Sequence, residues 1–289
     1  MTGKRGPDII ELAIVAILGI FLLVAFFPFW QMIVIAFSTP AEYAKSPYHV
    51  IPTSFSVDVF KQLLASKTVL TGLGVSLIVV LAGWSGGLVL TAMGAYALTK
   101  RAIIGHRVIL RFIIFTMYFS GGIIPLYVWM RTLGLTDTLW SLFLPSLVST
   151  FYLLVLKNYF SSIPIELEEA AMIDGYNEFQ ILFKIMIPVA KPAIAAISVF
   201  MVVGLWNDYY LGMLFLSKLE LFPLGLILRN VIISKQALMN TPLGSAGAML
   251  TTDQYNMAMI MVAMVPVAIV YPFAQRYFIS GISLGAIKE

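Results

Sequence analysis

One acidic residue stands in an otherwise apolar run in the last third of the chain. Asp208 lies in the sequence "GLWNDYYLG", where Trp206, Asn207 and Tyr209 surround it. An ionisable residue in such a run is costly to place, so it indicates a functional position by default. Aromatic rings can stack on the apolar face of a sugar, and amide and hydroxyl groups can pair with its hydroxyls. These four residues therefore predict the lining of a path for a sugar, and Asn207 suits an anionic sugar better than Asp208 does.

Two other interpretations of this group stay open. Asp208 can instead pair with a residue of a partner chain, because ionisable residues inside a membrane usually find partners. The aromatic residues can also belong to the belt of Trp and Tyr that lies at a membrane–water interface.

The rest of the sequence gives little support for enzyme chemistry. The chain has no cysteine, which excludes disulfides and thiolate metal ligands. His49 and His106 lie in separate polar stretches and form no metal-ligand pattern. No GxxxxGKS or GxxxxGKT phosphate loop occurs, so the chain cannot hydrolyse ATP by that route. We therefore predict no catalytic residue, no metal and no cofactor on this chain.

Composition indicates the kind of protein that must position these residues. The 289 residues are 60% hydrophobic and only 11% charged, whereas soluble globular chains carry about 25% charged residues. A helix needs about 20 apolar residues to cross the bilayer core, and only helices fit, because every backbone group must be bonded internally. Six segments qualify: roughly 11–37, 70–99, 107–131, 138–160, 187–217 and 257–280. The prediction is an all-α polytopic membrane protein with six transmembrane helices in a lipid bilayer, forming a single domain over residues 1–289.

The distribution of basic residues indicates the orientation. The connection "TKRAIIGHRVILR" is short and basic, as cytoplasmic loops are, so we place both termini in the cytoplasm. The net charge of +4 is explained by this asymmetry and gives no reason to expect nucleic acid as a partner. Two long connections, 38–69 and 218–256, then face outward, and loops of that length are usually functional or disordered.

Glycines mark two places inside the predicted spans. Gly83 and Gly87 form a small-xxx-small face, which favours close packing between helices. The sequence "SGGIIP", from Ser120 to Pro125, interrupts the third span and predicts a hinge, a widened cavity or, more commonly, a packed kink.

A polar segment, residues 164–188, lies between the fourth and fifth spans and so faces the cytoplasm. Pro164 suits a first helical turn, and the acidic residues that follow it, Glu169 among them, suit the positive end of the helix dipole. This helix is expected to end around Asp174 and Gly175, because glycine readily takes the left-handed conformation.

A second short helix is expected to start near Asn177, whose side chain can cap it. It carries Phe179, Leu182 and Phe183 on one side. Ala170 and Ala171, flanked by acidic residues on the first helix, would let another surface approach closely. A docking surface and a solvated amphipathic loop both fit these residues.

The sequence "EEAAMIDGYNEFQILFKIMIP", which ends at Pro188, resembles the EAA loop of binding-protein-dependent ABC importers. The Glu-Ala-Ala element of that loop is matched by Glu169, Ala170 and Ala171, and its glycine is matched by Gly175. The end of the pattern is matched by Ile185, Ile187 and Pro188, where Ile187 replaces the usual leucine. The sequences "FSGGIIPLYVWMRTLGLTDTLWSLFLP", "VGLWNDYYLGMLFLSK" and "RYFISGISLGAIKE" are similar to other parts of carbohydrate-importer permeases, including a subgroup for complex oligosaccharides such as alginate.

The resemblance implies a type I ABC importer permease in the bacterial cytoplasmic (inner) membrane. Segment 164–188 would be the coupling segment, docking on an ATPase subunit through Glu169, Ala170, Ala171, Asp174, Gly175, Tyr176 and Phe179. ATP and Mg would bind only to two ATPase subunits, so the chain would not itself be an enzyme. A second homologous permease subunit and a periplasmic or extracellular solute-binding protein would complete the importer, and an oligosaccharide would pass by alternating access.

An ion-gradient-driven secondary transporter is the main alternative. Such proteins carry inverted repeats and ion-coordinating acids in broken helices. The chain shows no internal repeat, and Asp208 alone is thin support for ion coupling.

Overall fold

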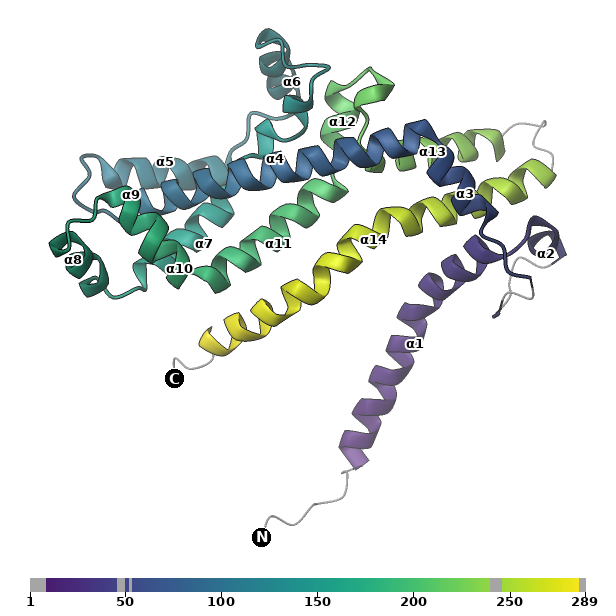
Figure 1. Cartoon of the computed structure of the whole chain (residues 1–289), viewed down its shortest axis with the longest axis horizontal. Helices are drawn as coiled ribbons and strands as arrows, with labels where there is room; N and C mark the ends of the chain where they lie inside the picture. The colour runs from purple at the N-terminus through teal and green to yellow at the C-terminus, as the bar shows by residue number, and fades with distance from the viewer. Residues whose placement is uncertain (1–8, 46–49, 52–53, 240–245, 286–289) are drawn as a thin grey trace. The chain divides into compact units, whose positions relative to one another are not determined.

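The computed structural model of the chain describes residues 9–45, 50–51, 54–239 and 246–285 (Figure 1). Within these ranges the backbone is helical apart from turns, and the β-pairing is an isolated antiparallel bridge between Ser38 and Phe55. The chain divides into two compact units, one made of residues 1–67 and 230–264 and the other of residues 68–229 and 265–289. Both chain ends, and so their predicted cytoplasmic placement, lie outside the described residues.

The helices follow one another along the chain in two groups, before and after Ser161. The first part contains α1 (Ile9–Phe37), α2 (Pro40–Lys45), α3 (Asp58–Ala65), α4 (Lys67–Ala97), α5 (His106–Tyr118), α6 (Ile123–Thr132), η1 (Leu139–Leu142), η2 (Leu144–Ser146) and α7 (Thr150–Ser161). The second part contains α8 (Glu166–Ile173), α9 (Glu178–Ile181), the π-helical turn η3 (Leu182–Met186), α10 (Ile187–Val189), α11 (Lys191–Asn207), α12 (Tyr210–Phe215), η4 (Leu219–Leu221), α13 (Leu224–Met239) and α14 (Ala246–Gly285).

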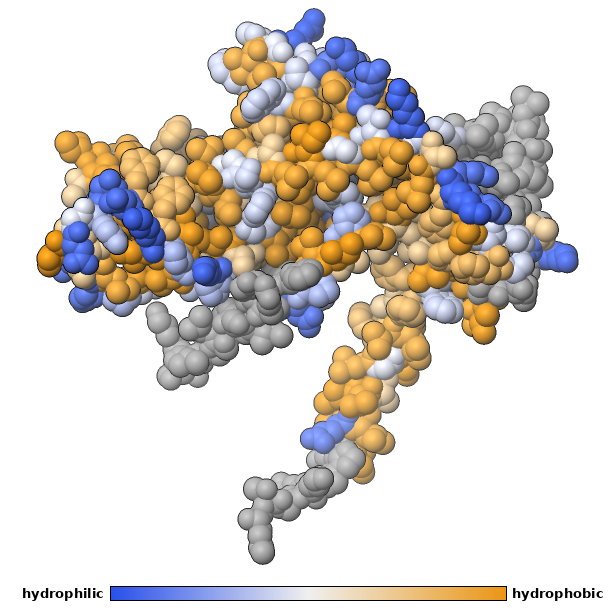
Figure 2. Space-filling view, in the orientation of Figure 1, coloured by the Kyte–Doolittle hydropathy of each residue, from blue (hydrophilic) through white to orange (hydrophobic). Residues whose placement is uncertain are grey.

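The predicted all-α fold is confirmed, and the predicted spans are found with more breaks than expected. Within the described residues, α1, α4 and part of α14 are each long and apolar enough to cross a membrane, and the number rises to six if each bent pair of helices counts as one span. Helix α1 is apolar along most of its surface (Figure 2), and none of its most apolar window is buried.

The "SGGIIP" sequence does more than kink the third span. Helix α5 ends at Tyr118, α6 begins at Ile123, and the two axes differ by 112°. Gly122 has φ +85°, a left-handed conformation that favours glycine. Pro125 follows in the first turn of α6, where its missing N–H costs nothing. The prediction of a packed kink is therefore wrong, because the helix ends and the chain changes direction by more than a right angle.

The fifth predicted span, 187–217, is also broken. Helix α11 ends at Asn207, and α12 begins at Tyr210. Before α11, the stretch from Glu178 to Val189 meets it at 85°. The apolar run is continuous in sequence, but the helix is not.

The core of the second unit joins the helices that the site depends on. Ala92, Ala95 and Tyr96 of α4 pack with Leu156 and Phe160 of α7. The same buried cluster takes in residues of α8 to α11: Ala171, Ile181, Leu182, Met186, Ala190, Ile197 and Met201. Apolar side chains thus attach the polar segment 164–188 to α4, α7 and α11.

Within the first unit, described residues of the connection 38–69 make defined contacts. Phe37 stacks on Phe55 with ring centroids 5.0 Å apart, and Gln254 of α14 donates a 2.6 Å hydrogen bond to the carbonyl of Ser38. Glu42 accepts hydrogen bonds from the backbone N–H and the hydroxyl of Ser54. Residues Asp58–Ala65 of this connection form the short amphipathic helix α3.

Candidate functional site

Segment 164–188 forms the predicted helix, turn and second helix. Helix α8 ends with Asp174 as its cap, and Gly175 follows at φ +81°. The N–H of Gly175 donates to the carbonyl of Met172, and the N–H of Tyr176 donates to that of Ala171, which is the Schellman arrangement. The predicted glycine stop is therefore confirmed in conformation and in hydrogen bonding.

The second helix of the segment begins with a capping box. The side chain of Asn177 accepts from the N–H of Gln180 at 2.9 Å, and the Gln180 side chain accepts from the N–H of Asn177 at 3.0 Å. The predicted cap is confirmed. Phe179 and Phe183 are exposed, whereas Leu182 is buried, so the expectation that these three share one side is wrong. Leu182 belongs to the core cluster that holds the segment.

The two alanines of the first helix face different ways. Ala170 is exposed, but only 4% of Ala171 is exposed. Ala171 packs into the core cluster of the same chain and is not available to a partner, so its predicted place on the docking surface is wrong. Its small size instead lets α8 lie close to the rest of the unit.

The outer surface of the segment is acidic and apolar together. Glu169, Asp174 and Tyr176 are exposed, as is Phe179 at 63%. Several larger apolar side chains are exposed beside them: Ile165 at 62%, Leu167 at 44%, Met172 at 46% and Ile173 at 87%. The outer side of this eight-residue helix therefore exposes apolar side chains that the described chain leaves uncovered, as a docking helix does.

One lysine beyond the end of α4 ties the segment to the unit. The ammonium of Lys100 lies 2.5 Å from Glu168 Oε2 of α8 and 3.1 Å from Glu178 Oε2 of α9. It also lies 4.5 Å from the ring centroid of Tyr96, whose hydroxyl donates to Glu178 Oε2 at 2.5 Å. Burial by itself would lower the pKa of Lys100, but its hydrogen bonds with Glu168, Tyr96 and Glu178 outweigh burial and raise it above its ordinary value. Lys100 therefore stays charged.

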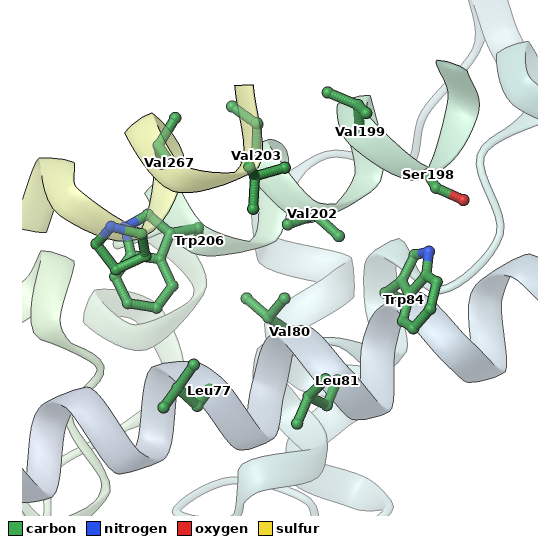
Figure 3. A pocket seen from close by; sticks show the side chains of 12 residues that line it. Leu77, Val80, Leu81, Trp84, Ser198, Val199, Val202, Val203, Trp206 and Val267 are labelled. Atoms are coloured by element: carbon green, nitrogen blue, oxygen red, sulfur yellow. The ribbon is translucent and has the colours of Figure 1, made fainter. Parts of the chain in front are cut away.

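The residues predicted to line a path do not share one surface. Trp206 is 7% exposed and lines an apolar cavity of about 300 Å³ between α4, α11 and α14. Figure 3 shows Trp206 and Trp84 at opposite ends of the labelled lining, with Val80 and Val202 between them. A cavity with this lining offers apolar and aromatic surface and almost no hydrogen-bonding groups.

Asp208 has a local partner that the sequence did not reveal. Its Oδ1 accepts from the N–H groups of Tyr210 at 2.7 Å and Leu211 at 3.2 Å, which starts α12. Asp208 also lines a second pocket of about 230 Å³. The polar side chains that share this pocket come from the break before α7 and from α7 itself: Ser146, Ser149 and Tyr152. Sequence analysis missed these three, although the helix-breaking sequence "LPSLVST" contains Ser146 and Ser149 and could have indicated them.

The other two residues of the group lie near α13. Tyr209 is 43% exposed, and the guanidinium of Arg229 lies 5.7 Å from its ring centroid. Asn207 is exposed at the end of α11. The break between α11 and α12 thus combines an amide, an aromatic ring and a cation.

Comparison with known proteins identifies the family. Residues 87–284 match the model of the binding-protein-dependent transport system inner membrane component. The chain is 37% identical over 280 residues to the polygalacturonan/rhamnogalacturonan transport system permease protein YtcP of Bacillus subtilis (strain 168). The matched region covers 96% of this chain and 98% of that protein. It is 36% identical over 261 residues to protein LplC of the same organism, covering 90% of this chain and 88% of that protein.

A solved structure supports the same assignment. A crystal structure of a bacterial ABC transporter involved in the import of the acidic polysaccharide alginate contains a chain with a TM-score of 0.86 and 33% identity, covering 96% of this chain and 99% of that chain. A second structure, of a bacterial alginate ABC transporter in complex with an alginate pentasaccharide-bound periplasmic protein, matches at a TM-score of 0.57 and 17% identity and supports the fold alone. The chain therefore belongs to the family of binding-protein-dependent transport system inner membrane components, and its fold is that of a type I ABC importer permease.

Proposed function

We propose that the chain is the membrane-spanning subunit of an ATP-driven importer that receives an oligosaccharide from a solute-binding protein and passes it to the cytoplasm by alternating access. The exposed acidic and apolar surface of α8, held on the chain by Ala171 and Lys100, carries this proposal. Residues 1–289 would act as a single permease domain in the bacterial cytoplasmic (inner) membrane with both termini in the cytoplasm. A second homologous permease and two ATPase subunits would complete the complex.

Helix α8 would dock on an ATPase subunit. Glu169 would supply an exposed charge, and Ile173 would insert an apolar side chain into the partner's surface, because only exposed side chains can enter such an interface. Gly175 would set the direction of the turn that follows. ATP-driven closure of the two ATPase subunits would then move α8 and rock the spans between inward and outward states.

An acidic oligosaccharide is the substrate class that fits best. Two similar proteins carry the names of a polygalacturonan/rhamnogalacturonan system and an alginate importer. In this chain, the guanidinium of Arg229 lies over the ring of Tyr209, and the exposed Asn207 is two residues before Tyr209 in the sequence. A guanidinium pairs well with a carboxylate, and an aromatic ring suits the apolar face of a sugar.

A matched pair of variants tests the docking role. Ile173→Ser changes an isoleucine that is 87% exposed on α8, and Ile104→Ser changes one that is 97% exposed in the connection between α4 and α5. Since neither is buried, both variants should fold. Ile173→Ser and Glu169→Lys should reduce copurification of the ATPase subunit and ATP-dependent uptake, whereas Ile104→Ser should leave both unchanged.

The same reconstituted complex tests the energy source and the substrate class. Uptake should require ATP, and binding protein loaded with uronate oligosaccharides should stimulate ATPase activity more than binding protein loaded with neutral ones. Uptake that follows an ion gradient without ATP would refute the proposal. Normal uptake in Ile173→Ser and Glu169→Lys together would remove the docking role from α8.

A further inference from the structure

The connection after α4 is anchored to that helix by its backbone. The N–H of Lys100 donates to the carbonyl of Ala97 at 3.2 Å, and the N–H of Thr99 donates to that of Tyr96 at 3.0 Å. The hydroxyl of Thr99 donates to the same Tyr96 carbonyl at 2.7 Å. A displacement of the Lys100 side chain would therefore be passed to the last turn of α4 through these backbone and side-chain hydrogen bonds.

The Lys100 ammonium joins helices that are far apart in sequence. Glu168 belongs to α8 and Glu178 to α9, and each places its Oε2 within ion-pair distance of the same Nζ. The Glu168 side chain is only 13% exposed and that of Lys100 is 24% exposed, so solvent screens this pair less than a surface pair. Removing the cation would leave two carboxylates facing one another across the turn between α8 and α9.

The apolar attachment of α8 is small by comparison. Ala171 is the buried side chain of this eight-residue helix. A methyl group in contact with the core sets the distance of α8 from the unit, but such contact is non-directional and does little to fix rotation about the helix axis. The Lys100–Glu168 pair, three residues before Ala171, supplies the second point of attachment that fixes that rotation.

We propose that Lys100 is a positioning residue that holds α8 and α9 in one orientation against α4, so that movement of α8 reaches α4 directly. This inference rests on the proposed docking of α8 on an ATPase subunit. The covalent route from α8 runs through α9 and α10 into α11. The Lys100–Glu168 ion pair connects α8 to α4 as well. Helix α4 lines the apolar cavity with Leu77, Val80, Leu81 and Trp84. Movement of one helix would thus shift two walls of that cavity together.

The test uses the full importer complex with variants Lys100→Gln, Lys100→Arg, Glu168→Gln and the double variant Lys100→Gln/Glu168→Gln. Arg107→Gln is the control, because Arg107 is exposed in the same basic region and forms no ion pair among the described residues. The readout is the number of oligosaccharides transported per ATP hydrolysed, which a purely structural role would not change in protein that is folded and assembled.

Lys100→Gln should lower transport per ATP by about fivefold or more, the lower end of typical coupling between sites. Lys100→Arg should retain most of it, and the double variant should be no worse than Lys100→Gln, because both substitutions break the same contact. Arg107→Gln should match the parent protein. Unchanged transport per ATP in Lys100→Gln, or a double variant whose loss is the product of the two single losses, would overturn the proposal.

A second measurement reports orientation directly. Because the chain has no cysteine, spin labels can be attached at introduced cysteines alone. Glu166→Cys and Arg101→Cys place labels on exposed positions of α8 and of the connection after α4, away from the residues proposed to dock. The distance distribution between these labels should broaden when Lys100→Gln is added, and an unchanged distribution would contradict the proposal.

Two outcomes separate this inference from the function on which it rests. If the parent complex shows no ATP-dependent uptake, the proposed function fails. If the parent complex transports but Lys100→Gln transports equally well per ATP, only the role of Lys100 fails. If Lys100→Gln and Lys100→Arg both fail to accumulate as folded protein, Lys100 serves folding alone and the proposal is overturned.

Discussion

Replacing Gly87 by alanine should destabilise the second unit, although alanine is the better helix former. Gly87 lies in the interior of α4. A Cβ at this position would meet the backbone oxygen of Leu147 well inside contact distance, and it would lie 2.7 Å from Cε of Met201. The methionine end can move aside, whereas the Leu147 carbonyl can move only if the backbone before α7 moves with it.

The size of the effect follows from two opposing contributions. Overpacking costs about 1–3 kcal/mol, and the backbone partner places Gly87→Ala near the upper end of that range. Alanine recovers about 1 kcal/mol of helix propensity relative to glycine. The net loss is therefore about 2 kcal/mol, which corresponds to a fall in melting temperature of about 4–8 °C at the scale of domains of this size.

Gly74→Ala is the matched control on the same helix. No atom lies within 4 Å of a Cβ built at Gly74, so only the propensity gain of about 1 kcal/mol applies. Thermal unfolding of the purified chain, followed by the fluorescence of its five tryptophans, should show Gly74→Ala at or above the parent and Gly87→Ala below it. Equal melting temperatures for the two variants would refute the packing argument.

Two further predictions concern acidic residues that hold backbone in place. Asp137 has φ +56°, and its Oδ1 accepts from the N–H groups of Ser217 at 2.6 Å and Lys218 at 3.3 Å. Asp137→Ala should therefore lower the free energy of unfolding by about 1–3 kcal/mol, measured by thermal unfolding. Asp137→Asn should recover most of that loss. Asp208→Ala should cost about 1 kcal/mol through loss of its two hydrogen bonds to the first turn of α12, and Asp208→Asn should restore stability. If Asp208→Asn still abolishes uptake in stable protein, the charge itself acts on the substrate.

The turn and the helix ends inside the polar segment could be predicted, because local signals determine them. Gly175 ends α8, and the Asn177 side chain starts α9, and both effects depend on the backbone within a few residues. The opposite orientations of Ala170 and Ala171 could not be predicted, because burial of Ala171 depends on Leu156 and Phe160 of another helix. The same limit applies to Lys100, whose partners lie 68 and 78 positions away along the chain.

Hydropathy located the spans but could not locate their breaks. The run from residue 187 to 217 carries only two charged residues, Lys191 and Asp208, so a window average predicts one helix there. The "SGGIIP" sequence predicts a break between α5 and α6. The angle of 112° between the two helix axes could not be predicted, because it depends on contacts with other parts of the chain. Composition reports how much of a segment is apolar, whereas the direction of a helix depends on contacts distant in sequence.

The break at Asp208 changes how an acid inside an apolar run should be interpreted. A helix that begins within a membrane exposes N–H groups in its first turn that must find acceptors. One carboxylate oxygen of Asp208 serves two of them, at Tyr210 and Leu211, and this accounts for an acid at this position without any substrate. The same break leaves the last carbonyl groups of α11 without partners inside their own helix. On the proposed path, a sugar hydroxyl would therefore find acceptors in the backbone oxygens at the end of α11 as well as in the Asn207 amide, because α11 ends at Asn207.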